Sequence, residues 1–242
     1  MAAFGVAAEF WAAVTGSMLS ERRGEHGQFV TLVPPAGDAW LRVQGVGDAG
    51  GAHLDFEVDD PDAMVAHAIA LGGEVAAAYD DGLVVVRSPA SVPFCVMPWS
   101  GASQRAPVTR HRNGTQSRLD QVCLDLPPSR HDAEVRFWSA LTGWRHRRGV
   151  LREFGLLRPP SDAGLPVQIL TQRLDDEGAV AAHHDVACSD LGAVCEVHEG
   201  YGARLVWRGP HWLVMRDPAG GVYCLTNRHP ETGRLALRDQ DD

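Results

Sequence analysis

Histidine and aspartate occur two residues apart at two places in the chain. The first pair is His53 and Asp55, and the second is His183 and Asp185. Side chains two positions apart on a strand point to the same face, so each carboxylate can orient its histidine as a general base or a metal ligand. The alternative, which the spacing slightly favours, is a hydrogen bond that only stabilises a strand end. We take His183 and Asp185 as the catalytic candidates, and His53 and Asp55 as ligand-binding candidates.

Other polar or sulfur-bearing side chains interrupt apolar segments. Gln44 and Gln172 end strand-like runs at matching positions, where their amides can bond a ligand. Cys224 lies among apolar neighbours, so we expect a buried, protonated thiol. Trp138 can line a ligand pocket, although an indole in the apolar stripe of a helix more often belongs to the core. These four side chains, together with Gln121, are the remaining predicted contacts with a small-molecule ligand.

The matching positions belong to an internal duplication. The motif FWAAVTG at 10–16 returns as FWSALTG at 137–143, and RSPA at 87–90 returns as RDPA at 216–219. A period of about 128 residues is far longer than a solenoid repeat, so it indicates a duplicated domain. We therefore divide the chain into a first copy (1–99), a linker (100–117), a second copy (118–230) and a tail (231–242).

Hydrophobic periodicity predicts the same order of elements twice: strand, helix and three strands. In the second copy we expect strands at 119–126, 153–157, 167–172, 184–188, 204–207, 212–216 and 222–226, and helices at 131–141 and 190–202. The first copy follows this plan, with helices near 6–15 and 61–71. Only nine residues precede Phe10, however, so its first strand is absent.

A missing strand leaves an open sheet edge, which favours association with another strand. One hypothesis is that the alternating tail segment 233–238 (GRLALR), or a strand from a second chain, fills this edge. The favoured alternative is that the native start lies upstream or that the edge is simply open. Self-association through the first copy is therefore one expectation.

Composition limits the partners. The chain has 242 residues, 45% of them hydrophobic, and 31 acidic against 22 basic residues give a net charge of −9. Since there is no long basic run, nucleic acid is not an expected partner. No stretch approaches the roughly 20 apolar residues of a membrane span. The five cysteines are odd in number and form no CxxC pair, which indicates buried thiols in a cytoplasmic protein.

The ordered motifs resemble the vicinal oxygen chelate superfamily, and in particular its glyoxalase-like, bleomycin-resistance-like modules. The resemblance rests on the FW-x-x-[LV]-TG helix, the HxD strand followed by a helix ending near a glycine, and the closing R-[SD]-PA-x-x-x-[FY]-C strand, each found twice. It implies an α+β fold of two tandem modules, built from paired βαβββ units that form cupped mixed sheets. Each cup would enclose a pocket for a small molecule.

Metal-using members of this superfamily hold a divalent ion with side chains on the inner strand faces, where it acts as a Lewis acid on vicinal oxygens. The resemblance places the four ligand positions of the second copy at Gln121, near Ile169, at His183 and at Cys224. In the first copy, the corresponding positions are near Leu41, at His53 and at Cys95. Because Ile169 and Leu41 cannot bind metal, Gln121 and His183 remain as an incomplete ligand set. Together with Cys224 they could bind zinc or a similar divalent ion, but the favoured expectation is a protein without a metal cofactor and without typical glyoxalase I activity.

Two functions follow from the resemblance. The first is an enzyme, a lyase, isomerase or dioxygenase acting on vicinal oxygens. In it His183 is the ligand or base, Asp185 orients it, and Gln121 contacts a substrate oxygen. The alternative is a non-catalytic protein that sequesters a small molecule, as antibiotic-resistance relatives do. In either case we expect the working pocket in the complete second copy.

Overall fold

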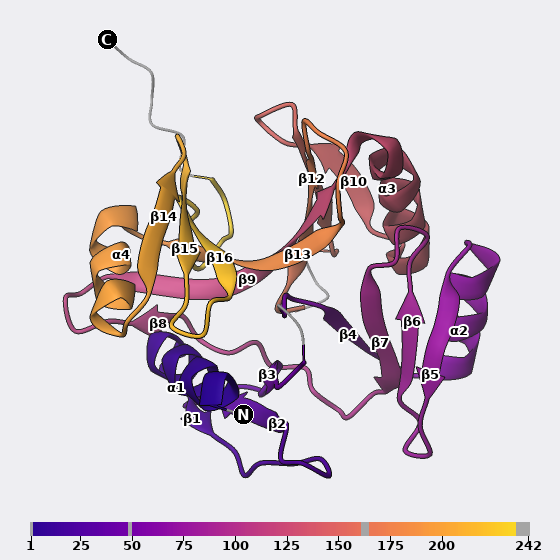
Figure 1. Cartoon of the computed structure of the whole chain (residues 1–242), viewed down its shortest axis with the longest axis horizontal. Helices are drawn as coiled ribbons and strands as arrows, with labels where there is room; N and C mark the ends of the chain where they lie inside the picture. Colours follow the sequence, from indigo (N-terminus) through magenta and orange to yellow (C-terminus); the bar gives the residue numbers. More distant parts are fainter. Residues whose placement is uncertain (1, 48–49, 161–164, 236–242) are drawn as a thin grey trace. The chain divides into compact units, whose positions relative to one another are not determined.

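The computed structural model describes residues 2–47, 50–160 and 165–235 (Figure 1). The first copy contains α1 (Ala2–Thr15), β1 (Met18–Leu19), β2 (Phe29–Val33), β3 (Leu41–Gln44), β4 (Leu54–Val58), α2 (Pro61–Ala70), β5 (Glu74–Ala78), β6 (Val84–Arg87) and β7 (Pro93–Pro98). There follow β8 (Thr109–Arg110), β9 (Gln116–Leu126), α3 (Pro128–Thr142), β10 (Arg145–Arg148), β11 (Phe154–Arg158), β12 (Gln168–Arg173), β13 (Ala181–Cys188), α4 (Leu191–Gly200), β14 (Arg204–Arg208), β15 (Trp212–Arg216) and β16 (Val222–Thr226). The predicted α+β class with mixed sheets is confirmed.

The predicted order of elements in the second copy is also found. β15 and β16 have the predicted ends, and α4 begins after Asp190, whose carboxylate accepts a hydrogen bond from the Ala193 backbone N at 2.9 Å. β10 lies outside the predicted strand ranges, because its sequence, RHRR, has no apolar alternation. The predicted linker contains β8 and the start of β9. Within the described ranges, no helix is long and apolar enough to cross a membrane.

The chain forms two compact units, and each unit combines parts of both copies. Unit 1 comprises residues 1–50, 104–120 and 184–242, and unit 2 comprises 51–103 and 121–183. Unit 1 thus joins the first half of the first copy to the second half of the second copy, while unit 2 joins the two remaining halves. β9 and β13 each contribute residues to both units. The compact units therefore differ from the sequence copies, whose boundaries remain a prediction.

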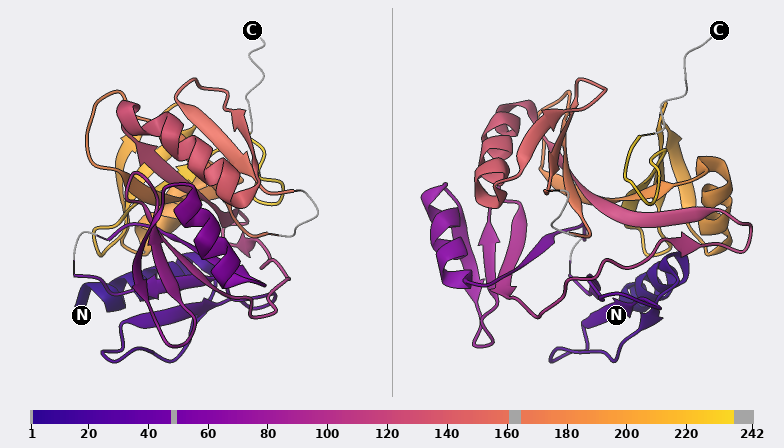
Figure 2. Two further views of the ribbon diagram at one scale, coloured as in Figure 1. Left: turned by 90° about the vertical axis from the view of Figure 1, so that its right-hand side faces the viewer. Right: turned by 180° about the vertical axis from the view of Figure 1, so that it is seen from behind.

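Unit 2 contains two helices, each packed on a mixed sheet. α2 covers strands ordered β4-β7-β6-β5, and α3 covers strands ordered β10-β11-β12-β9. β4 pairs with β7 in parallel, as β12 does with β9, and the other pairs are antiparallel. The helices are neighbours (Figure 2), and His67 Nε2 lies 3.2 Å from the Ala140 carbonyl oxygen. Fully buried side chains such as Trp138, Phe94 and Leu124 form the core.

Unit 1 contains the antiparallel sheet β1-β2-β3 and strands ordered β13-β16-β15-β14, with β13 and β16 parallel. α1 and α4 contribute to one hydrophobic core, in which the rings of Trp11 and Tyr223 lie 5.0 Å apart in an edge arrangement. His198 is fully buried there, with Nδ1 at 2.9 Å from the Tyr223 hydroxyl. Burial lowers the pKa of His198 to about 3, so the neutral ring accepts the hydroxyl hydrogen.

A buried carboxylate ties the tryptophan of one helix to a closing turn in each unit. In unit 2, Glu134 accepts hydrogen bonds from Trp138 Nε1 at 2.8 Å and from the Ala90 backbone N at 2.7 Å. In unit 1, Asp217 accepts a hydrogen bond from Trp11 Nε1 at 3.2 Å and two more from backbone N–H groups of its own turn. Each helix is thereby fixed to a turn that comes from the other sequence copy.

The two copies place this carboxylate differently. It lies on the helix in unit 2 and on the turn in unit 1, since the position of Glu134 is occupied by Ala7 in the first copy and that of Asp217 by Ser88. Each unit has one acidic group at this link between helix and turn, because a buried indole N–H and a buried backbone N–H both need an acceptor. Both units therefore have the same interaction, but the acidic residue that makes it occupies a different position of the repeat.

The open edge expected in the first copy lies beside β3. Among the described strands, β3 pairs with β2 alone. Just before β3, the Asp38 backbone N donates to the Gln104 carbonyl oxygen at 2.8 Å, and the Asp38 carboxylate accepts from the Gln104 N at 2.6 Å. The tail does not fill this edge where it is described, because Leu235 forms a bridge with Arg228. Leu237 lies outside the described residues.

Replacing Glu134 tests the tie in unit 2. Glu134→Ala leaves the Trp138 and Ala90 N–H groups buried without an acceptor, so we expect it to lower the free energy of unfolding by about 3 kcal/mol. Glu134→Gln should cost less, since the amide keeps one acceptor oxygen. Urea denaturation measures both, and Arg136→Ala, exposed on the same helix, should change stability by less than about 0.5 kcal/mol. Equal stability of all three variants would contradict the tie.

Candidate functional site

β9 presents a polar face in unit 2 because its other face is committed to the core. Val122, Leu124 and Leu126 are buried in the cluster that contains the side chains of α3. Side chains alternate along a strand, so Gln121, Cys123 and Asp125 point to the opposite face. The position predicted from the resemblance, Gln121, therefore shares a face with two residues that the sequence analysis did not single out.

The register of β12 corrects one predicted position. Ile169 lies opposite Val122, is fully buried and belongs to the core, so it is on the wrong face for a ligand position. Its neighbours Gln168 and Gln172 lie opposite Gln121 and Asp125 on the polar face. Because the side-chain period of a strand is two, an error of one residue moves the position to the other face.

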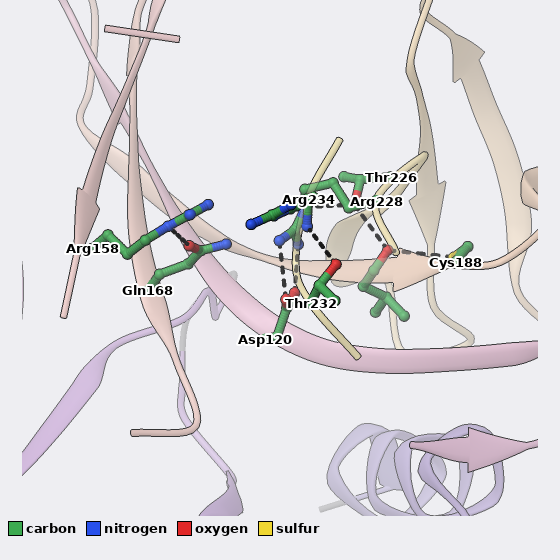
Figure 3. Close-up of polar contacts among 9 residues, drawn as sticks. Asp120, Arg158, Gln168, Cys188, Thr226, Arg228, Thr232 and Arg234 are labelled. Carbon is green, nitrogen blue, oxygen red and sulfur yellow. Dashed lines mark hydrogen bonds and ion pairs between the residues drawn. The ribbon is translucent and has the colours of Figure 1, made fainter. Parts of the chain in front are cut away.

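Gln168 joins a further polar group to this face. Its Oε1 accepts a hydrogen bond from Arg158 Nε at 3.3 Å (Figure 3), and its side chain comes from β12 while the arginine comes from β11. Gln168 is 8% exposed and Gln121 is 2% exposed. Two buried amides lie in register here, beside a guanidinium. These hydrogen-bonding groups suit a polar ligand better than an apolar one, because buried polar groups need hydrogen-bond partners.

His183 meets this face from β13. Its Nδ1 lies 2.9 Å from Asp125 Oδ2. Cys123 Sγ lies 3.8 Å from Asp125 Oδ1 and 3.9 Å from Gln172 Oε1. The His183 side chain is 13% exposed and that of Asp125 is 20% exposed, so both are half-buried but reachable. Three strands thus bring four functional side chains together, and Asp125 is a carboxylate partner of His183 that the sequence analysis missed.

The arrangement of His183 and Asp125 is suited to proton transfer. A carboxylate bonded to one ring nitrogen fixes the tautomer, places the lone pair on the other nitrogen, and stabilises the imidazolium that forms. Cys123, Asp125 and His183 also offer ligand atoms that all lie within 4.8 Å of one another. Thiolate, carboxylate and imidazole are donors that zinc accepts, although the Cys123 thiol is 1% exposed.

The four-residue metal set implied by the resemblance does not fit this structure. Ile169 has no donor atom and faces the core. Cys224 lies opposite Asp185 in the pairing of β13 with β16. We therefore assign no step of a reaction to a metal at those positions.

Two other predicted contacts have different surroundings. Trp138 is fully buried in the core and donates its indole hydrogen to Glu134, so the prediction that it contacts a ligand is corrected: no face of the ring is accessible. Gln44 is exposed at the end of β3, opposite Phe29, and belongs to no cluster of site residues in the described parts of unit 1. Gln44 and Gln172 were predicted as matching ligand contacts, and of the two Gln172 lies on the polar face.

His53, Asp55 and Cys95 form a second cluster in unit 2. His53 Nε2 lies 3.0 Å from Asp55 Oδ1, and Asp55 is opposite Cys95 in the parallel pairing of β4 with β7. The three ligand atoms lie within 4.8 Å of one another. Hydrogen bonds to Asp55 and then to Cys95 raise the pKa of His53 from 6.5 to about 10, against the opposing effect of burial. The ring is therefore protonated near neutral pH, which suits an ion pair better than a base.

The raised pKa of His53 predicts a pH-dependent contribution to stability. Because the folded-state pKa of about 10 exceeds the unfolded value of 6.5, the contribution is complete below pH 6.5 and is lost as the pH rises to about 10. The side chain is 35% exposed, so solvent screening should limit it to less than about 1 kcal/mol. Urea denaturation of the wild type and His53→Gln should show a stability difference that shrinks over this range.

The control for this measurement is the same substitution in an Asp55→Asn background. Without the carboxylate the main cause of the raised pKa is gone, so the difference caused by His53→Gln should depend much less on pH. A difference that stays constant from pH 6.5 to 10 in the wild-type background would show that the pair contributes no linked protonation.

Comparison with protein families agrees with the duplication. The family described as "Glyoxalase-like domain" matches residues 1–97 and 121–226, which together make up most of the chain. No curated protein matches the sequence.

Solved structures share the fold at low sequence identity. The 2,3-dioxygenase LapB from Pseudomonas sp. KL28 is similar with a TM-score of 0.60 and 15% identity, over 92% of this chain and 87% of that chain. A triple mutant of 4-hydroxymandelate synthase from Streptomyces coelicolor is similar with a TM-score of 0.57 and 13% identity, over 96% of this chain and 90% of that chain. A catechol 2,3-dioxygenase has a TM-score of 0.57 and 13% identity, over 96% of this chain and 89% of that chain. These likenesses concern the fold, and with the family match they lead to one conclusion: the chain belongs to the glyoxalase-like domain family of the vicinal oxygen chelate superfamily, with two tandem modules.

Proposed function

We propose that this protein binds a small organic molecule with neighbouring oxygen atoms on the polar face of β9, β12 and β13, and that His183 moves a proton in it. The observation that carries the proposal is the 2.9 Å contact between His183 Nδ1 and Asp125 Oδ2. The two side chains come from residues 58 apart in the sequence and meet on a half-buried face. An imidazole fixed by a carboxylate is the arrangement that general-base catalysis requires.

The groups along β9, β11 and β12 favour a ligand rich in oxygen. Gln121 and Gln168 can each donate and accept through their amides, and Arg158 supplies a positive charge beside Gln168. A hydroxyl beside a carbonyl would satisfy two neighbouring amides at once. Oxygen atoms of a ligand can accept hydrogen bonds from the amide N–H groups of Gln121 and Gln168, whereas an apolar ligand cannot.

The proton transfer uses the two nitrogens of His183 differently. Since Asp125 is an acceptor, Nδ1 carries the hydrogen and Nε2 has the lone pair. Nε2 removes a proton from a ligand carbon or hydroxyl, the Asp125 carboxylate stabilises the imidazolium, and the same nitrogen returns the proton to a neighbouring atom. This is the proton balance of an isomerase-type step, and it needs no additional reactant. In this proposal Asp125 holds the role that the sequence suggested for Asp185.

A second candidate function is sequestration of a small molecule without reaction. The observation that favours it is the polar face of β12, where Gln168 and Gln172 offer amides but no carboxylate to a metal. A pocket without a complete metal set can still bind through its amides and its guanidinium. The five cysteines are free thiols, which supports the proposal that the protein works in the reducing cytoplasm.

Deuterium exchange separates the two functions. In D2O, the protein should accelerate exchange of the carbon-bound protons next to the carbonyl of hydroxyacetone, dihydroxyacetone or lactaldehyde, followed by proton NMR. His183→Gln should lower the catalysed rate by about 100-fold or more, and Asp125→Asn by about 10-fold or more, because the base is lost or disoriented. Both variants should keep the melting temperature within a few degrees.

The matched control is His26→Gln, which removes an exposed histidine of unit 1 and should leave the exchange rate unchanged. If the wild type binds one of these probes, seen as broadening of its NMR lines, without exchanging its protons, then sequestration is the better description. Equal exchange by the wild type and His183→Gln would overturn the assignment of the base.

A further inference from the structure

Unit 1 contains a cavity that the proposed function of unit 2 does not use. Its volume is about 380 Å³, toward the small end of the range for ligand sites of about 300–1,000 Å³. The end of α1, strands β2 and β3, the segment before β8 and the start of β9 surround it. Three arginines line it: Arg105, Arg110 and Arg118. Such a concentration is notable in a chain with a net charge of −9.

Arg118 retains an unused donor in this cavity. Its side chain is 10% exposed, and Nη2 lies 3.2 Å from Glu231 Oε2. Its Nε is buried and has no hydrogen-bond partner among the described residues. Glu231 is 49% exposed, so this ion pair is weak and can be replaced. A buried guanidinium with a free N–H is costly unless an acceptor occupies the site.

The surrounding charges leave an excess of positive charge. Asp120 is already paired with Arg228, which donates from Nη1 to Oδ2 at 3.0 Å and from Nη2 to Oδ1 (Figure 3). Partial burial lowers the pKa of Arg105, and the positive charge of Arg118 lowers it further. The positive groups here are Arg105, Arg110, Arg118 and Arg228, and the carboxylates that act on them or on one another are those of Asp120, Asp185 and Glu231. One monoanion would balance these four positive and three negative charges.

The rest of the cavity wall is apolar. Leu32 and Leu41 lie opposite each other on β2 and β3, and Trp40, Val108 and Leu119 add to the same lining. An indole and branched aliphatic side chains suit a flat or branched hydrocarbon body, which would lose contact with water on binding. The cavity thus combines a cationic end with an apolar wall.

From this juxtaposition we infer a binding site for a small organic carboxylate, with its carboxylate between Arg105 and Arg118 and its apolar body against Trp40. The planar guanidinium of Arg118 offers the fork geometry that a carboxylate matches. All the residues involved belong to unit 1, so the inference does not depend on the function proposed for unit 2.

Calorimetric titration with benzoate tests the site on the whole protein. Benzoate should bind with a Kd below about 1 mM, and benzyl alcohol, which has the same ring without the charge, at least about 10-fold more weakly. Raising the salt concentration should weaken the binding of benzoate, since the ligand is an anion. Inorganic phosphate should bind at least about 10-fold more weakly than benzoate, because it has no apolar body to contact the wall.

Arginine variants locate the binding. Arg118→Gln and Arg105→Gln should each weaken benzoate binding by about 10-fold or more, whereas Arg112→Gln, exposed in the turn between β8 and β9, should leave the affinity unchanged. Because Arg105 is at the surface, its substitution keeps the test valid if Arg118→Gln fails to fold. Equal affinity for benzoate and benzyl alcohol, phosphate binding as tight as that of benzoate, or full affinity in the Arg105→Gln variant would overturn the inference.

Discussion

The structure depends on one buried interaction, the carboxylate that accepts a tryptophan indole hydrogen and is anchored at a closing turn. Glu134 makes it in unit 2 and Asp217 makes it in unit 1. In both cases the helix comes from one sequence copy and the turn from the other, so neither compact unit is complete without both copies. A buried acceptor shared by several donors tolerates little movement, because any lost bond leaves a polar group unsatisfied. This constraint accounts for the pairing of half-copies seen in the units.

The same constraint determines where chemistry can occur in unit 2. With α3 held against β9 and β12, the residues Val122, Leu124 and Ile169 are committed to the core. The opposite face is then free for polar side chains, and Asp125 meets His183 there. The functional face is the complement of the core face, so the packing of a helix selects the residues that can act as acid, base or ligand.

The two halves of the duplication have diverged in chemistry while keeping their architecture. His53 pairs with the neighbouring carboxylate of Asp55, and its raised pKa gives the two the character of an ion pair. His183 has a longer-range carboxylate partner on β9 and the geometry of a base. In unit 1, by contrast, three arginines line a cavity. A repeated sequence thus supplies repeated positions, but burial and neighbouring charge decide what each position does.

The duplication, the order of strands and helices, and the family can be predicted from the sequence, because periodicity and turn residues act locally and are preserved in short motifs. The sequence also pointed to His183, Gln121 and Gln172. Three features became apparent in the folded structure: half-copies pair across the repeat, Ile169 faces the core, and Asp125 is a partner of His183. These features depend on strand register and on contacts between distant segments. A shift of one residue reverses the face of every side chain on a strand, and no local pattern reports which strand lies beside it.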